Sequence, residues 1–153
     1  MIIAALVFSA RNQAAYWQNS QTLFEHALNV TEKNDLAHNN LGNVLNKLGR
    51  TDEAITHYLQ ALRINPNFDK AHNNLGNTLN RLERTDEAII HYRKSLTINP
   101  YNERIHYNLA VALYRKGNIT ETIKHLQIAI TLNPDYAPAK NFGERLQNIQ
   151  ISK

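Results

Sequence analysis

Apolar residues recur at intervals of three and four along most of the chain, which is the spacing of one face of an α-helix. Within residues 35–68 these positions form two runs: Ala37, Leu41, Val44, Leu45 and Leu48, then Ala54, Ile55, Tyr58, Leu59, Ala61 and Leu62. Gly49 separates the runs, and Asn65-Pro66 ends the second because proline cannot continue the hydrogen bonds of a helix. The segment therefore predicts an antiparallel pair of helices.

The same pattern returns at a fixed distance of 34 residues. Aligned without a gap, segments 35–68 and 69–102 are identical at 23 of 34 positions, and 103–136 is a weaker copy. A repeat of this length is one helical unit whose apolar face is buried only by stacking on its neighbours. We predict an all-α fold with full repeats at 35–68, 69–102 and 103–136, preceded by a half-repeat helix at 14–34.

The segments outside the repeats have patterns of their own. Residues 137–153 place Pro138 in a first helical turn and continue with one apolar stripe, which predicts a capping helix and tail. Segment 1–13 holds the apolar run Ile2 to Phe8, which is too short to span a bilayer that needs about 20 residues. It is interpreted as a signal peptide, as an apolar helix packing on the first repeat, or as the end of a transmembrane helix.

Some single positions predict local features. Thr51 is expected to cap the second helix of its repeat, with Asp52 and Glu53 in the first turn, where negative charge suits the helix dipole. Glu83 replaces the turn glycine of the second repeat, and Thr122 replaces a small alanine of the third. Both replacements are expected to weaken their repeats.

Composition and charge exclude several classes of function. The chain has 153 residues, 42% of them hydrophobic and 20% charged, and a net charge of +4 without a basic block, so nucleic acid is not an expected partner. It contains no cysteine and no catalytic motif, so we expect no enzyme activity. Six histidines fall in two repeat registers, which we interpret as packing and surface positions without a metal or other cofactor: His38, His72, His106, His57, His91 and His125.

The small and large positions resemble the signature of the tetratricopeptide repeat family. The signature is Leu41-Gly42-x-x-Leu45, Ala54, Tyr58, Ala61 and Pro66, and it returns as Leu75-Gly76-x-x-Leu79, Ala88, Tyr92, Ser95 and Pro100. The resemblance implies a right-handed α-α superhelix with a peptide-binding groove lined by first helices. The residues that map to this groove are Asn39, Asn40, Asn43, Asn46, Lys47, Lys70, Asn73, Asn74, Asn77, Asn80, Arg81, Arg104, Tyr107, Asn108, Val111, Tyr114 and Arg115.

Asparagine is frequent in this set although it is a poor helix former. Asn40, Asn74 and Asn108 resemble the asparagine ladder by which O-linked N-acetylglucosamine transferase holds its protein substrates, and such amides can bind a peptide backbone. The family's carboxylate clamp, which binds the acidic C-terminal tails of chaperones, fits less well. Asn39 and Asn108 stand where the clamp has lysine and arginine. Chaperone-tail binding is therefore not expected.

The sequence predicts a non-catalytic module that binds a peptide segment of a partner protein. An alternative is the soluble C-terminal tail of a membrane-bound protein, because the junction from Phe8 to Leu28 resembles polytopic glycosyltransferase-like proteins that end in such repeats. A third is weak self-association through the half-repeat. The sequence names neither the partner nor the compartment, and it links the chain to a membrane only through the N-terminal segment or a missing one.

Overall fold

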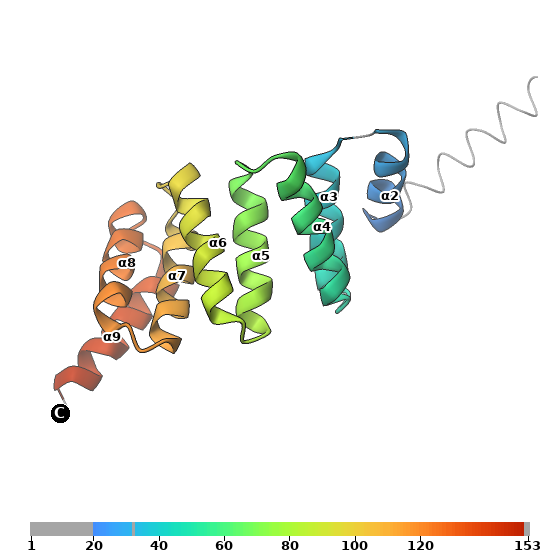
Figure 1. Ribbon diagram of the computed structural model, residues 1–153. Coiled ribbons are helices and arrows are strands. Elements are labelled where there is room, and N and C mark those ends of the chain that lie inside the picture. Colours follow the sequence, from blue (N-terminus) through green and yellow to red (C-terminus); the bar gives the residue numbers. More distant parts are fainter. Residues whose placement is uncertain (1–19, 32, 152–153) are drawn as a thin grey trace, which may run out of the picture. The chain divides into compact units, whose positions relative to one another are not determined.

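The computed structural model describes residues 20–31 and 33–151, and these residues form helices joined by short turns, without strands (Figure 1). The helices are α2 (Ser20–Val30), α3 (Asp35–Lys47), α4 (Thr51–Ile64), α5 (Asp69–Arg81), α6 (Thr85–Ile98), α7 (Glu103–Arg115), α8 (Ile119–Leu132) and α9 (Ala137–Ile151). This confirms the predicted all-α class. The chain divides into two compact units, one up to Pro66 and one from Asn67 onward.

In the first unit, α3 packs against both α2 and α4. α3 and α4 approach each other closely at Gly42, where an added Cβ would lie 2.7 Å from Cε1 of Tyr58. Tyr58 is completely buried, as is Ala54. The small residue on one helix and the aromatic ring on the other therefore fix how the pair packs.

In the second unit, consecutive helices pack on one another from α5 to α9. Gly76 and Tyr92 repeat the close approach of α5 and α6, with a Cβ-to-Cε1 distance of 2.8 Å. Farther along, α9 contributes Ala139 and Leu146 to a buried cluster with residues of α7 and α8. The helix predicted for the end of the chain is therefore present and covers the last helix pair.

The turn between paired helices requires a left-handed backbone. Gly49 and Gly117 have φ angles of 79° and 75°, and Glu83 has 62°. The same backbone hydrogen bond spans each of these turns. In the second repeat, for example, the Arg84 N–H donates to the Leu79 carbonyl at 3.0 Å. Glu83 thus takes the glycine conformation, which is unfavourable for a residue with a Cβ.

The prediction that Thr51 caps α4 is wrong. Thr51 is the first residue of the helix, and the capping position belongs to Arg50, whose side chain makes no capping hydrogen bond. The guanidinium of Arg50 instead donates to both carboxylate oxygens of Glu53 at 2.6 Å. The start of α4 is held by this ion pair and by the Arg50 N–H, which donates to the Leu45 carbonyl at 2.9 Å.

Thr122 is completely buried where the other repeats have Ala54 and Ala88. Its hydroxyl donates to the Asn118 carbonyl at 2.8 Å, one turn earlier in the chain. Because a buried hydroxyl is costly only when it lacks a partner, the larger residue is accommodated.

Among the described residues, no helix is long and apolar enough to cross a membrane. The three interpretations of residues 1–13 lie outside the described residues, as does the start of the half-repeat.

Candidate functional site

Asparagine side chains join the first helices of the second unit. Nδ2 of Asn108, on α7, donates to Oδ1 of Asn77 at 2.9 Å and to Oδ1 of Asn73 at 3.3 Å, both on α5. Oδ1 of Asn77 also accepts the hydroxyl of Tyr92 at 2.8 Å. Burial raises the pKa of Tyr92, so this hydroxyl stays protonated and acts as the donor. Three residues predicted to line one groove therefore do meet.

The same contact occurs in the first unit, where the Tyr58 hydroxyl donates to Oδ1 of Asn43 at 2.9 Å. Asn43 and Asn77 are therefore the hydrogen-bond partners of buried tyrosines, a packing role that the sequence analysis did not assign. The sequence does contain a signal for this contact, because tyrosine follows asparagine by 15 residues in both pairs.

A second set of asparagines closes each repeat. Nδ2 of Asn65 donates to Oδ2 of Asp35 at 2.8 Å, and Asn99 donates to Asp69 at 3.1 Å. Each pair is 30 residues apart and links the end of a second helix to the start of its first helix. Part of the asparagine content is thus explained by contacts within repeats.

Two members of the predicted groove have little surface left for a partner. Asn39 is 4% exposed and Asn80 is 9% exposed. The guanidinium of Arg115 donates to the Asn80 backbone carbonyl at 2.7 Å and to its Oδ1 at 3.1 Å, which ties α7 to the end of α5. Asn80 is therefore placed to hold α7 against α5.

The other predicted residues are more accessible. The exposed ones are Lys47, Lys70, Arg81, Arg104, Tyr114 and Arg115. The half-buried ones are Asn40, Asn43, Asn46, Asn73, Asn74, Asn77, Tyr107, Asn108 and Val111. In each unit, therefore, most of the predicted residues retain some accessible surface.

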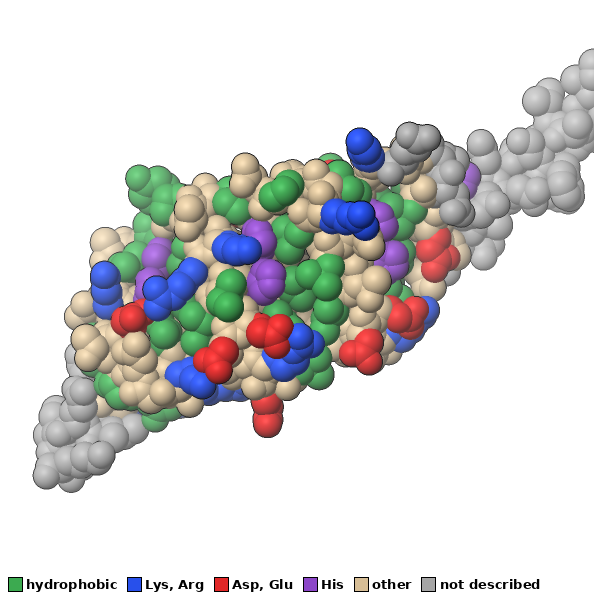
Figure 2. Space-filling view, in the orientation of Figure 1, with side chains coloured by type: hydrophobic (Ala, Val, Ile, Leu, Met, Phe, Trp, Pro, Cys, Tyr) green, Lys and Arg blue, Asp and Glu red, His purple; other side chains and the backbone are tan. Residues whose placement is uncertain are grey.

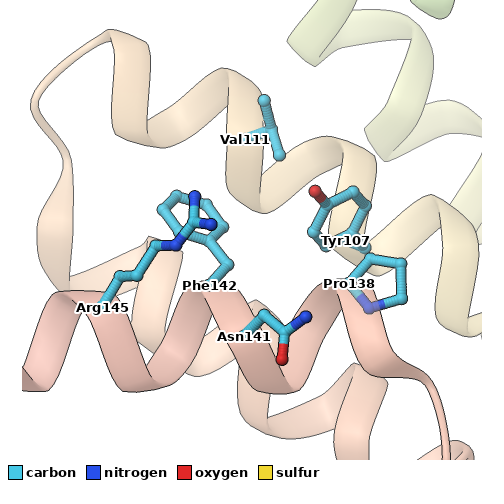
Figure 3. A pocket seen from close by; sticks show the side chains of 6 residues that line it. All are labelled: Tyr107, Val111, Pro138, Asn141, Phe142 and Arg145. Atoms are coloured by element: carbon cyan, nitrogen blue, oxygen red, sulfur yellow. The ribbon is translucent and has the colours of Figure 1, made fainter.

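A pocket of about 310 Å³ lies between α7 and α9 (Figure 3). Tyr107 and Val111 approach it from α7, and the remaining lining residues belong to α9: Pro138, Asn141, Phe142 and Arg145. We call this the α7–α9 pocket. The α7 residues of this pocket were predicted from the sequence as groove residues, whereas α9 was predicted only as a cap.

Aromatic rings form one wall of this pocket. The ring of Phe142 meets those of Tyr107 and Tyr114 edge to face, at centroid distances of 6.4 and 5.2 Å. Tyr107 also meets Tyr136 at 5.7 Å. Such contacts restrict the rings, so the wall is formed before a ligand arrives.

Each repeat also contains a pair of histidines joined through Nδ1. The Nδ1–Nδ1 distance is 2.9 Å in all three pairs: His38–His57, His72–His91 and His106–His125. The two registers are visible in the sequence, but the contact between their members within a repeat was not predicted from it. The missed signal was the constant separation of 19 residues.

These histidines favour the neutral state. Burial and, to a lesser extent, the partner histidine together lower the pKa of His91 and of His125 to about 4. Among the described residues, no group of three or more potential metal ligands is present, so a pair lacks further protein ligands. Figure 2 shows histidine side chains at the surface among hydrophobic ones.

A second, more open groove of about 610 Å³ is bordered by α6, α7 and α8, and we call it the α6–α8 groove. Its lining is largely aliphatic, with Leu96, Leu109 and Ile128, and it includes the histidine pair of the third repeat. No residue of the predicted groove lines it. Sequence reasoning therefore gave no indication of this site.

Stacked antiparallel helix pairs with a repeating set of contacts define a helical-repeat protein. Family models described as tetratricopeptide repeat match residues 23–56, 69–102 and 103–136, and one described as TPR repeat matches residues 42–82. The chain is thus a tetratricopeptide repeat protein. Among curated proteins, no relative matches it.

Several solved structures share this fold. YrrB, described as a TPR protein with an unusual peptide-binding site, has a TM-score of 0.72 and 27% identity, over 81% of this chain and 64% of YrrB, slightly under two thirds of its length. MamA has a TM-score of 0.73 and 16% identity, over 86% of this chain and 76% of its own.

A third structure is the first TPR of Spaghetti (RPAP3) bound to an HSP90 peptide. Its TM-score is 0.74 at 20% identity, over 78% of this chain and 94% of its own. At this identity the likeness extends to the fold alone, as it does for MamA. None of these comparisons supports the predicted resemblance of the N-terminal junction to glycosyltransferase-like membrane proteins, which stays a prediction.

Proposed function

We propose that this protein binds a peptide segment of a partner and that, in its second unit, the peptide lies along α5 and α7 and reaches the α7–α9 pocket. The role is recognition, without catalysis. The YrrB and RPAP3 structures support it at the level of the fold, since both are described with peptide binding.

The observation that carries this proposal is the α7–α9 pocket. It combines a preformed aromatic wall with two polar side chains, Asn141 and Arg145, at its α9 side. Its volume of about 310 Å³ is at the lower end of ligand pockets, which suits one apolar side chain of a peptide. The guanidinium of Arg145 is available to a carboxylate or backbone carbonyl of the same peptide.

The neighbouring amides can extend the contact along the peptide. Asn108 donates to both Asn73 and Asn77, and each of these amides has two donors and two acceptor lone pairs. A peptide backbone offers the same groups, so it can replace amide–amide bonds without leaving a polar group unpaired. The interface is small, and micromolar affinity is expected.

The test begins with peptides selected on the intact protein from a random peptide library, followed by fluorescence anisotropy. Val111→Arg fills the α7–α9 pocket and should weaken binding about tenfold or more. Asn74→Ala should weaken it about fivefold, the equivalent of one hydrogen bond. Circular dichroism should show an unchanged fold in both variants.

Ile90→Arg is the matched control, because Ile90 is a 54% exposed aliphatic residue on α6 outside the pocket. It should leave the affinity unchanged. If Val111→Arg binds the selected peptides as tightly as Ile90→Arg does, the pocket is not where they bind.

The alternative of a membrane-tethered tail rests on the junction from Phe8 to Leu28 and that of self-association on the half-repeat at 14–34, and both segments begin before the described residues. No contact of the described residues favours either one over peptide binding.

A further inference from the structure

The α6–α8 groove contains a histidine whose protonation pattern is determined by its neighbours. Nε2 of His106 lies 3.0 Å from the Pro100 carbonyl oxygen. A carbonyl can only accept, so Nε2 of His106 carries the proton. In the neutral ring, Nδ1 of His106 is then the acceptor.

This assignment determines the state of His125. Its Nδ1 lies 2.9 Å from Nδ1 of His106 and must donate, so its own proton is on Nδ1. The ring centroids are 5.2 Å apart and the ring planes are 28° from parallel, so the rings are stacked with an offset that brings the two Nδ1 atoms together. Nε2 of His125 is therefore unprotonated, and its lone pair can accept a hydrogen bond.

That lone pair is available to a ligand. His125 borders the α6–α8 groove, and among the described residues its only hydrogen bond is through Nδ1. The described residues include no fully buried polar side-chain atom without a partner, so Nε2 of His125 is reached by solvent. The groove thus combines aliphatic walls with the oriented lone pair of His125, and the polar side chains of Arg93 and Thr97 lie at its α6 side.

The surrounding charges determine what kind of donor fits. Arg93 on α6 and Lys124 on α8 lie close enough to oppose a positive charge on His125, and Glu121 offsets them in part while paired with Arg93. His106, on α7, also opposes a positive charge on His125. A metal ion or a lysine side chain is therefore disfavoured, and an anion would meet a lone pair. A neutral O–H or N–H is the complementary group.

We propose that the α6–α8 groove binds a tyrosine or tryptophan side chain of a partner peptide, whose hydroxyl or indole N–H donates to Nε2 of His125. These side chains combine a large apolar body with a neutral donor at one end. The ring packs on Leu96, Leu109 and Ile128, and the acceptor distinguishes it from phenylalanine. This site is separate from the α7–α9 pocket and does not rest on the peptide contacts proposed there.

The first measurement is nuclear magnetic resonance of the full chain with ¹⁵N-labelled histidine. Long-range proton–nitrogen spectra distinguish the two neutral forms of imidazole, and His125 should carry its proton on Nδ1. A proton on Nε2 would overturn the proposal.

The second measurement is a titration of the same sample with N-acetyl-tyrosine amide, N-acetyl-tryptophan amide and N-acetyl-phenylalanine amide. The tyrosine and tryptophan amides should shift the His125 Nε2 resonance and bind about fivefold more tightly than the phenylalanine amide, as one neutral hydrogen bond predicts. Equal affinities in the wild-type chain would refute the role of the acceptor, and this comparison needs no variant.

Two variants locate the site. His125→Phe should abolish the preference for tyrosine over phenylalanine, whereas His91→Phe, the same substitution one repeat earlier, should keep it. Ile128→Arg should weaken all three ligands by obstructing the groove. A preference that survives His125→Phe in a folded protein would place the binding elsewhere.

Discussion

Glu83 is the non-glycine residue with a positive φ among the described residues. Its angle of 62° lies close to those of Gly49 and Gly117, which occupy the equivalent turns. The geometry of the turn is therefore determined by the helices on either side, and the residue must adopt it at a cost of about 1–2 kcal/mol.

Replacing Glu83 with glycine should raise the free energy of unfolding by about 0.5–1 kcal/mol, since glycine relieves the strain but adds entropy to the unfolded chain. Urea denaturation measures this change in the free energy of unfolding. The converse is Gly117→Ala, where no atom lies within 4 Å of the added Cβ, so only the backbone is affected. The free energy of unfolding of Gly117→Ala should be lower by about 1 kcal/mol. If the Glu83→Gly protein is no more stable than wild type, Glu83 is not strained.

Gly76 and Tyr92 form a matched small and large pair, as Gly42 and Tyr58 do. In the third repeat the equivalent residues are Ala110 and Leu126, both buried in one cluster. A larger residue on the first helix thus accompanies a smaller one on the second, which indicates that the two positions share a constant volume.

Gly76→Ala should therefore lower the free energy of unfolding by about 1–3 kcal/mol, because the methyl group meets the Tyr92 ring. Adding Tyr92→Leu should recover part of this loss, since leucine already packs against alanine in the third repeat. Thermal and urea denaturation of the four proteins of this cycle measure the coupling. Strictly additive losses would show that the two side chains do not compete for space.

At the scale of the helices, the histidine pairs connect the first and second helix of every full repeat. Burial lowers the pKa of His38, His57, His91, His106 and His125 relative to the ordinary value of 6.5. Below pH 6.5 the unfolded chain therefore binds more protons than the folded one.

The free energy of unfolding should accordingly be highest above pH 6.5 and should fall as the pH decreases towards about 4, where His91 and His125 titrate in the folded state. Urea denaturation across this range measures the slope. The double variant His91→Phe and His125→Phe should show a shallower fall, which separates the histidines from the carboxylates. An identical slope in both proteins would rule the histidines out.

Helix positions could be predicted from the sequence because three- and four-residue spacing, turn glycines and Asn-Pro pairs are local signals. The start of α4 was predicted incorrectly because the ion pair of Arg50 with Glu53 replaces the expected threonine cap. The histidine pairs and the α7–α9 pocket depend on contacts between helices, which one-dimensional spacing does not report. The repeat boundaries and the groove residues stay predictions.

At the scale of the whole molecule, the chain divides after Pro66. In the unit that begins at Asn67, each helix from α5 to α9 packs on its neighbours in chain order, and α9 covers Ala110, Leu126 and Ala129. Repeat proteins derive their stability from such nearest-neighbour interfaces. The interfaces within this unit should therefore supply most of its stability.

A fragment of residues 67–151 should therefore fold by itself, with a helical circular dichroism spectrum and a cooperative thermal transition. A shorter fragment, 67–136, lacks α9 and should melt at a lower temperature because the cluster around Leu126 becomes exposed. If both fragments melt alike, α9 does not act as a stabilising cap.

In each of the first two repeats, three side-chain contacts lie inside the repeat's own 34 residues: tyrosine with asparagine at a separation of 15, histidine with histidine at 19, and asparagine with aspartate at 30. A stretch of DNA encoding one such segment therefore specifies all of these bonds together. In-frame copying of that stretch would lengthen the protein while keeping these bonds intact, and this offers a physical route by which recombination adds units to the gene.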